Sequence, residues 1–181
     1  MKRLSRSVIA ILIVVFSCFC RISNGRERRS SVDSVLSGFA GYRLLTLNEL
    51  DPDARAFFLK HFPKANPSVV HADFNGDGNL DYALLLRNDK SEAAKLVILL
   101  CSQDTHCRSV SESDISGYSG SAFVRPVAKG SKVSQTESIE TGSPPVSLKF
   151  SGVRVTYFGK AEVVLYWNEK AKKIESITTA D

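Results

Sequence analysis

Five oxygen-bearing side chains alternate along one nine-residue stretch of the chain, at Asp73, Asn75, Asp77, Asn79 and Asp81. Alternate residues of a tightly curled loop point toward one centre, and a hard cation such as Ca²⁺ prefers roughly six to eight oxygen ligands. Three carboxylates so close together repel one another unless a cation neutralises them. The spacing therefore predicts a calcium site formed by four of these side chains and by the backbone carbonyl of Asn79.

The other residues of this stretch fit a loop between two strands. Gly78 permits the sharp reversal that brings later residues back over the ion, and Leu80 is expected to anchor the loop to the core. An EF-hand is excluded, because Leu84 stands at the twelfth position, where that motif needs a bidentate Glu. A cation-free hairpin turn remains the alternative, since Asn-Gly and Asp-Gly pairs are also common turn residues.

The sequence Asp-Phe-Asn-Gly-Asp-Gly-Asn-Leu-Asp, followed by Tyr-Ala-Leu-Leu-Leu, resembles the calcium loop of FG-GAP and VCBS repeats. The resemblance covers residues 69–86 and implies that the loop joins two neighbouring strands. It also implies the calcium ligands, which are the side chains of Asp73, Asn75, Asp77 and Asp81 and the carbonyl of Asn79. The sequence contains one such loop, whereas a propeller needs several blades, so we expect a single calcium loop and no propeller.

The N-terminus has the layout of an export signal. Three basic residues precede an apolar run at residues 8–20, and a short polar stretch follows it. This run is shorter than the roughly 17 to 25 residues that span a bilayer. We therefore predict a signal peptide over residues 1–25, a secreted or periplasmic protein and no stable membrane insertion once the signal is cleaved. A retained N-terminal membrane anchor and lipid attachment at Cys18 are the alternatives.

Residues 26–34 are charged and serine-rich and are predicted to form a flexible leader to a single domain over residues 35–181. Removal of the signal leaves two cysteines, Cys101 and Cys107, in the exported chain. In an oxidising compartment this pair predicts a disulfide that closes a short loop and stabilises the fold by about 2 kcal/mol. A redox-active pair is the alternative, although the spacing is not Cys-x-x-Cys.

The hydrophobic pattern indicates one helix followed by strands. From Thr46 to Phe62 apolar residues recur at three- and four-residue steps, with Asp51 and Pro52 near the start and Pro63 at the end. β-branched and aromatic runs predict strands at residues 68–71, 82–87, 95–101, 122–127, 146–150, 153–158, 161–167 and 173–178. Between them, residues 109–145 are expected to be long loops around one or two edge strands. The expected fold class is α+β, with one N-terminal helix packed on a mostly antiparallel β-sheet in a single domain.

The charge of the chain is less informative than it first seems. The formal net charge is +5, but four of the 24 basic residues and none of the 19 acidic residues lie in residues 1–25, which leaves the exported chain at +1. We therefore expect no nucleic-acid partner.

The sequence shows no catalytic constellation, which favours a non-catalytic binding or interaction module. Its protein or glycan partner and its oligomeric state are not identified. The alternative is an exported hydrolase with a calcium-organised site near His71.

Overall fold

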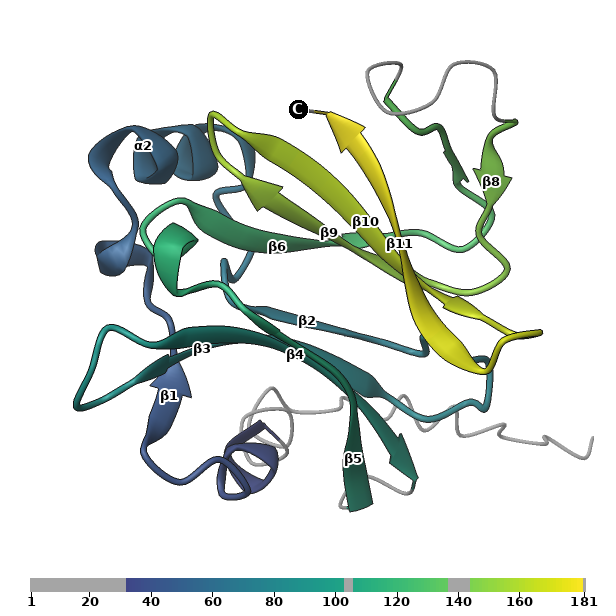
Figure 1. The fold of residues 1–181 in the computed structure, drawn as a ribbon, viewed down its shortest axis with the longest axis horizontal. Coiled ribbons are helices and arrows are strands. Elements are labelled where there is room, and N and C mark those ends of the chain that lie inside the picture. The colour runs from purple at the N-terminus through teal and green to yellow at the C-terminus, as the bar shows by residue number, and fades with distance from the viewer. Residues whose placement is uncertain (1–31, 103–105, 137–143, 181) are drawn as a thin grey trace, which may run out of the picture.

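Two antiparallel β-sheets stacked face to face make up most of the molecule (Figure 1). The computed structural model describes residues 32–102, 106–136 and 144–180. The predicted signal peptide at residues 1–25 and most of the predicted leader at residues 26–34 lie outside the described residues. Within the described ranges, no helix is long and apolar enough to cross a membrane.

The first sheet carries the predicted loop between two of its strands. It consists of β1 (Tyr42–Leu44), β2 (Val69–Ala72), β3 (Asp81–Asn88), β4 (Ala94–Ser102) and β5 (His106–Asp114). β3, β4 and β5 pair in chain order, while β1 and β2 share the remaining edge of β3. The register of β2 on β3 places Ala72 opposite Asp81, so the loop between these strands closes a hairpin.

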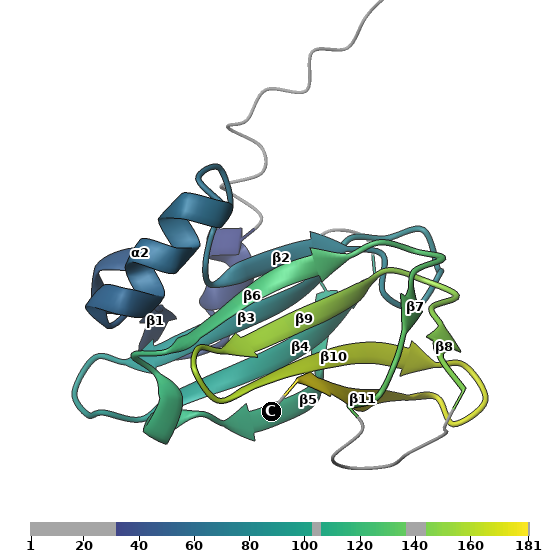
Figure 2. The same cartoon turned by 90° about the horizontal axis from the view of Figure 1, so that it is seen from above.

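The second sheet has the strand order β11, β10, β9, β6. Its strands are β6 (Ala122–Val127), β9 (Gly152–Tyr157), β10 (Ala161–Asn168) and β11 (Lys173–Ala180). A small third sheet, β7 (Lys132–Val133) paired with β8 (Val146–Ser147), packs against Val164 and Ile177 of the second sheet. β2 and β6 come from different sheets but lie side by side (Figure 2), which closes one edge of the stack.

The main core lies between the two large sheets, because successive side chains of a strand point to opposite faces. Ala83 and Leu85 of β3 join Phe123 and Val155 of the second sheet in this core. The helix α2 (Pro52–His61) adds Phe58, whose ring centroid lies 5.2 Å from that of Phe123. This helix lies within the predicted helical segment, with Pro52 in its first turn.

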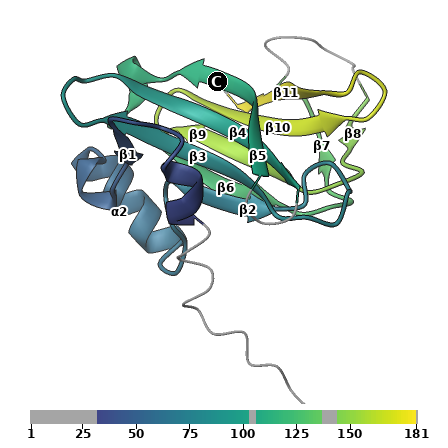
Figure 3. The ribbon, with the colours of Figure 1, turned by 90° about the horizontal axis from the view of Figure 1, so that it is seen from below.

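The other face of the first sheet is also buried. Leu84 and Leu86 of β3 pack with Val32 and Val35, which belong to a short helical stretch at residues 32–36. Figure 3 shows this stretch on the side of the first sheet that faces away from the second sheet. Burial on both faces explains why β3 and β4 are nearly continuous apolar runs.

Two 3₁₀ turns, η1 (Leu47–Glu49) and η2 (Ser116–Tyr118), connect these elements. Glu49 fixes the first turn by accepting hydrogen bonds from the Thr46 amide (2.8 Å) and from the Arg43 guanidinium (2.7 and 2.8 Å). The hydrogen bonds from Arg43 are the main reason that the pKa of Glu49 falls from 4.5 to about 2. This carboxylate therefore ties β1 to the segment that leads into α2.

The expected α+β fold class is wrong. The structure is a mostly antiparallel β protein with two stacked sheets, and α2 follows β1 instead of beginning the domain. One reason is β5, a largely exposed edge strand whose residues His106–Asp114 are mostly polar and therefore lack a strand-like apolar pattern. The other is that pairing between distant segments, such as β6 with β9, leaves no local pattern in the sequence.

The individual strands were predicted more successfully than their arrangement. β2, β3, β4, β6, β9, β10 and β11 all overlap predicted strands. The strand expected at residues 146–150 shrinks to β8, and β1, β5 and β7 were not predicted as separate strands. The three that were missed are either very short or poor in apolar residues, which are the two conditions that weaken a strand signal.

Candidate cation-binding loop

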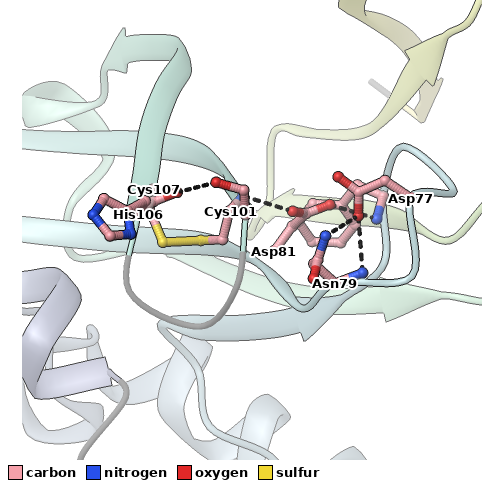
Figure 4. Close-up of a disulfide and its surroundings, with 8 residues drawn as sticks. Asp77, Asn79, Asp81, Cys101, His106 and Cys107 are labelled. Atoms are coloured by element: carbon pink, nitrogen blue, oxygen red, sulfur yellow. Dashed lines mark hydrogen bonds between the residues drawn. A yellow bond between two sulfur atoms is a disulfide. The ribbon is translucent and has the colours of Figure 1, made fainter.

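Residues 73–80 form the loop between β2 and β3, and Asp81 is the first residue of β3. Figure 4 shows Asp81 between the loop residues Asp77 and Asn79 on one side and Cys101, near the end of β4, on the other. The predicted ligand residues therefore lie together at one end of the first sheet, on a hairpin whose two strands are neighbours.

Asp73 curls the first half of the loop. Its carboxylate accepts hydrogen bonds from the amides of Gly76 (2.6 Å) and Gly78 (3.0 Å). Both glycines have positive φ angles, +81° and +86°, which side chains disfavour. The predicted reversal at Gly78 is confirmed. Gly76 is more tightly constrained than Gly78, because a Cβ there would lie 2.0 Å from Cε1 of the Phe150 ring, whereas a Cβ at Gly78 would meet nothing within 4 Å.

The second half of the loop is held by side chains that bond to the backbone two residues further on. Asn75 accepts a hydrogen bond from the Asp77 amide (2.9 Å), and Asp77 accepts one from the Asn79 amide (2.8 Å). The side-chain amides of Asn75 and Asn79 also donate to Asp77, each at 3.0 Å. The hydrogen bond from the Asn79 backbone amide is the main reason that the pKa of Asp77 lies below its ordinary value. This exposed carboxylate is therefore held in its charged form.

Asp81 differs from the other acids of the loop because it is fully buried. One carboxylate oxygen accepts from the Phe74 amide (2.8 Å) and the other from the Cys101 amide (2.9 Å). Burial raises the pKa of Asp81 from 3.8 to about 6; the two amides oppose this rise, and the charges of Asp77 and Asp73 add to it. The buried carboxylate thus lies in the field of two further negative charges.

No basic side chain forms an ion pair with this cluster in the described part of the chain, although His106 and Arg108 line the same hollow as Asp77. None of the ion pairs formed by the described residues includes Asp73, Asp77 or Asp81. Carboxylates gathered in this way are stabilised by a cation, which offsets both their mutual repulsion and the desolvation of the buried member.

The donor set fits a hard divalent cation, since it consists of carboxylate and amide oxygens without sulfur or nitrogen ligands. In the observed conformation these oxygens bond to amides of the loop. Within the described residues, no group of three or more His, Cys, Asp or Glu side chains is arranged to hold a metal ion. A carboxylate has about four acceptor positions. Amide hydrogen bonds and cation coordination can therefore share one side chain after small rotations.

The anchor of the loop is a different residue from the one predicted. Leu80 was expected to reach the core, but its side chain is 46% exposed. Phe74 fills this role instead, since it is buried in the main core and its amide is bound by Asp81. The alternation of the loop could not make this choice, because Phe74 and Leu80 each lie between two oxygen-bearing residues.

The expected disulfide is present between Cys101 and Cys107. The two residues lie opposite each other in the register of β4 and β5, close to the turn end of that hairpin. A hollow of about 510 Å³ lies between this hairpin and the loop at residues 73–80, and Asn75, Asp77, Cys101 and Cys107 are among its lining residues. The loop and the disulfide are separate features in the sequence, but the fold brings them together.

His71, the residue singled out for a possible hydrolase, is exposed on β2. It lines a different hollow, of about 620 Å³, whose other lining residues are mostly apolar: Val32, Leu44, Val69, Val70, Leu80, Tyr82, Val124 and Pro126, with Asp33, Lys64, Ala65 and Asn66. No serine, threonine or cysteine, the usual hydroxyl and thiol nucleophiles, is among the described lining residues of that hollow.

We found no match to the chain among protein-family models, curated proteins or solved structures. The case for a cation site therefore depends on the residues of the loop and on their arrangement.

Proposed function

We propose that the chain is an exported calcium-binding protein in which the loop from Asp73 to Asp81 holds one structural Ca²⁺. The observation that carries the proposal is the buried carboxylate of Asp81, which faces two other acids and forms no ion pair with the described residues. A calcium ion would neutralise this cluster, and its ligands would come from Asp73, Asn75, Asp77 and Asp81 together with the carbonyl of Asn79.

The ion would act on stability and not on a reaction. It would fix the hairpin of β2 and β3 at the end of the first sheet, where the loop otherwise depends on hydrogen bonds to exposed side chains. We propose a non-catalytic binding or interaction module, because the hollow beside His71 has no serine, threonine or cysteine among its described lining residues. Its partner would be a protein or a glycan at the cell surface, in the periplasm or outside the cell.

Export is supported by two features. The basic and apolar pattern of residues 1–25 is typical of a signal peptide. The Cys101–Cys107 disulfide is a kind of bond that persists mainly in oxidising compartments. Intact-mass measurement of the protein recovered from its native compartment tests export, because cleavage near Gly25 would remove the first 25 residues. Recovery of the uncleaved chain from the cytoplasm would contradict it.

Thermal unfolding with EDTA and then with about 1 mM CaCl₂ tests the calcium site. For a dissociation constant near 10⁻⁴ M, about 1 mM calcium stabilises the fold by about 1.4 kcal/mol, which raises the melting temperature by roughly 3 to 6 °C. Asp77→Ala is expected to lose this response.

Asp114→Ala is the matched control for Asp77→Ala. Asp114 also accepts a hydrogen bond from the backbone amide two residues further on, that of Ser116 (2.8 Å), but it lies at the far end of β5. The control should therefore keep the full calcium response. If wild-type protein melts at the same temperature in EDTA and in calcium, the proposed function is wrong.

A further inference from the structure

The amide of Cys101 connects the disulfide to the acidic loop. In an antiparallel sheet the amide of each residue points toward one neighbouring strand only. Pairing between β3 and β4 ends at Tyr82 and Leu99, so Cys101 lies beyond the last paired residue on that side. Its amide therefore has no backbone carbonyl of β3 opposite it and donates a hydrogen bond to Asp81 Oδ1 at 2.9 Å instead. The carboxylate takes the place of a strand partner.

The position of this amide depends on β5 and the disulfide. Beyond Leu99, β4 pairs with β5 alone, and β5 is an edge strand with mostly exposed residues. A two-stranded end of this kind is prone to fraying. The bond between Cys101 and Cys107 joins the two strands one pair before the end of their ladder. It therefore holds the Cys101 amide against Asp81.

We propose that the Cys101–Cys107 disulfide is a redox control of the calcium loop: the loop binds its cation more tightly when the disulfide is formed than when it is reduced. This inference rests on the proposed calcium function. With the disulfide formed, Asp81 is held between the amides of Cys101 and Phe74, and Phe74 is the second residue of the loop. With the disulfide reduced, the end of the hairpin frays and Asp81 loses one of its two fixed hydrogen-bond donors. Part of the binding free energy of the cation is then spent on ordering the loop, so the affinity for the cation falls.

The redox step is a thiol–disulfide exchange with a dithiol reductant. One reductant thiolate attacks a sulfur of the pair and forms a mixed disulfide; its second thiolate then displaces that bond. The protein gains two electrons and two protons as two thiols, and the reductant becomes a cyclic disulfide. Both cysteines line the hollow of about 510 Å³ that the loop residues Asn75 and Asp77 also line, so the reagent approaches from the side of the loop.

Calorimetric titration of the full chain with CaCl₂ tests the proposal in three forms: oxidised wild type, wild type reduced with dithiothreitol, and the C101S/C107S variant. The matched control is C18S/C20S, which removes the same number of cysteines from residues outside the described structure. Reduction and C101S/C107S are each expected to weaken calcium binding by at least about fivefold, the lower end of typical coupling between sites. C18S/C20S should bind calcium as the wild type does.

Linkage supplies a second measurement that needs no variant. If oxidation tightens calcium binding fivefold, saturating calcium must favour the oxidised form by the same factor. The ratio of reduced to oxidised dithiothreitol that half-reduces Cys101–Cys107 in wild-type protein should then rise about fivefold when EDTA is replaced by CaCl₂. This measurement decides the question even if C101S/C107S does not fold.

The outcomes separate the two proposals. Equal calcium affinities in the oxidised and reduced wild type, within twofold, overturn the redox control and leave the calcium function intact. If oxidised wild type does not bind calcium, the calcium function fails. The coupling of the disulfide to the loop is then judged by hydrogen exchange of the Phe74 amide: faster exchange after reduction supports it, and unchanged exchange overturns it.

Discussion

Asp81→Asn tests the buried carboxylate most directly. Asn has nearly the same shape but no charge, and its single side-chain oxygen can accept from only one of the two amides that Asp81 now satisfies. The substitution therefore removes a buried charge and leaves one buried amide without its acceptor. The second effect costs about 1 to 3 kcal/mol and does not depend on pH. The first effect depends on pH and can be separated from it.

The pKa of Asp81 sets the size and sign of that dependence. Burial is the main reason that it rises from 3.8 to about 6 on folding. The difference corresponds to about 3 kcal/mol. The folded state therefore binds the proton more tightly than the unfolded state. Cation-free protein gains stability from this group as the pH falls from about 6 toward 3.8, and gains nothing further below that value.

Urea unfolding of wild type and Asp81→Asn in chelator-treated buffer, from about pH 7.5 to pH 3.5, measures this contribution. Comparison with the variant cancels the titration of all other groups. The free energy of unfolding of the wild type minus that of the variant should rise by about 3 kcal/mol on acidification. A difference that stays constant over this range would show that Asp81 carries no unneutralised buried charge and would refute the reasoning.

Calcium should reverse this trend. A bound cation favours the ionised carboxylate and lowers its pKa, so the wild type in millimolar CaCl₂ should gain stability as the pH rises from about 4 to 7. Asp81→Asn, which lacks the titrating group and one calcium ligand, should show neither the gain nor a strong calcium response. The same two proteins thus test the buried charge and the cation that is proposed to neutralise it.

Three further predictions concern the loop, the core and the capped turn. Gly76→Ala should destabilise the protein by at least about 1 kcal/mol more than Gly78→Ala in urea unfolding, because both have positive φ but only the first would overlap a neighbouring ring. Phe58→Ala should cost about 3 to 5 kcal/mol, whereas Leu59→Ala, at a side chain that is 46% exposed, should change stability by less than about 0.5 kcal/mol. Glu49→Gln should remove the contribution of the ionised Glu49 carboxylate to the free energy of unfolding. This contribution is fully present above pH 4.5 and is lost as the pH falls toward 2, so the stabilities of the wild type and the variant in urea unfolding should converge in acid.

The parts of the structure that the sequence predicted well are those fixed by neighbouring residues. The curled loop follows from alternating Asn and Asp side chains that bond to amides two or three residues away, and from Gly78 at a positive φ. The helix α2 follows from Pro52 and the repeat of apolar residues after it. The bond between Cys101 and Cys107 was predicted from their short distance in the sequence together with the expected export of the chain to an oxidising compartment.

The parts that were missed depend on contacts between distant segments. β5 is mostly polar and becomes a strand only because β4 offers it a row of partners that is interrupted once, by a register shift between Ile98 and Leu99. Leu80 was expected in the core because it is apolar, but the curl of the loop turns Phe74 inward instead. No local pattern could reveal that the Cys101 amide binds Asp81, because those residues are twenty positions apart and meet only when β3 and β4 pair.

The backbone around Asp81 explains why an acid stands at this position. A buried amide without a strand partner needs another acceptor, and the amides of Phe74 and Cys101 lie just outside the paired segments of β3 with its neighbours. A carboxylate at the first residue of β3 satisfies both, whereas an Asn could satisfy one. The remaining penalty is the buried charge, which the nearby acids increase. A cation in the loop would remove that penalty and keep both hydrogen bonds, so the same geometry that requires an acid at Asp81 also favours a cation beside it.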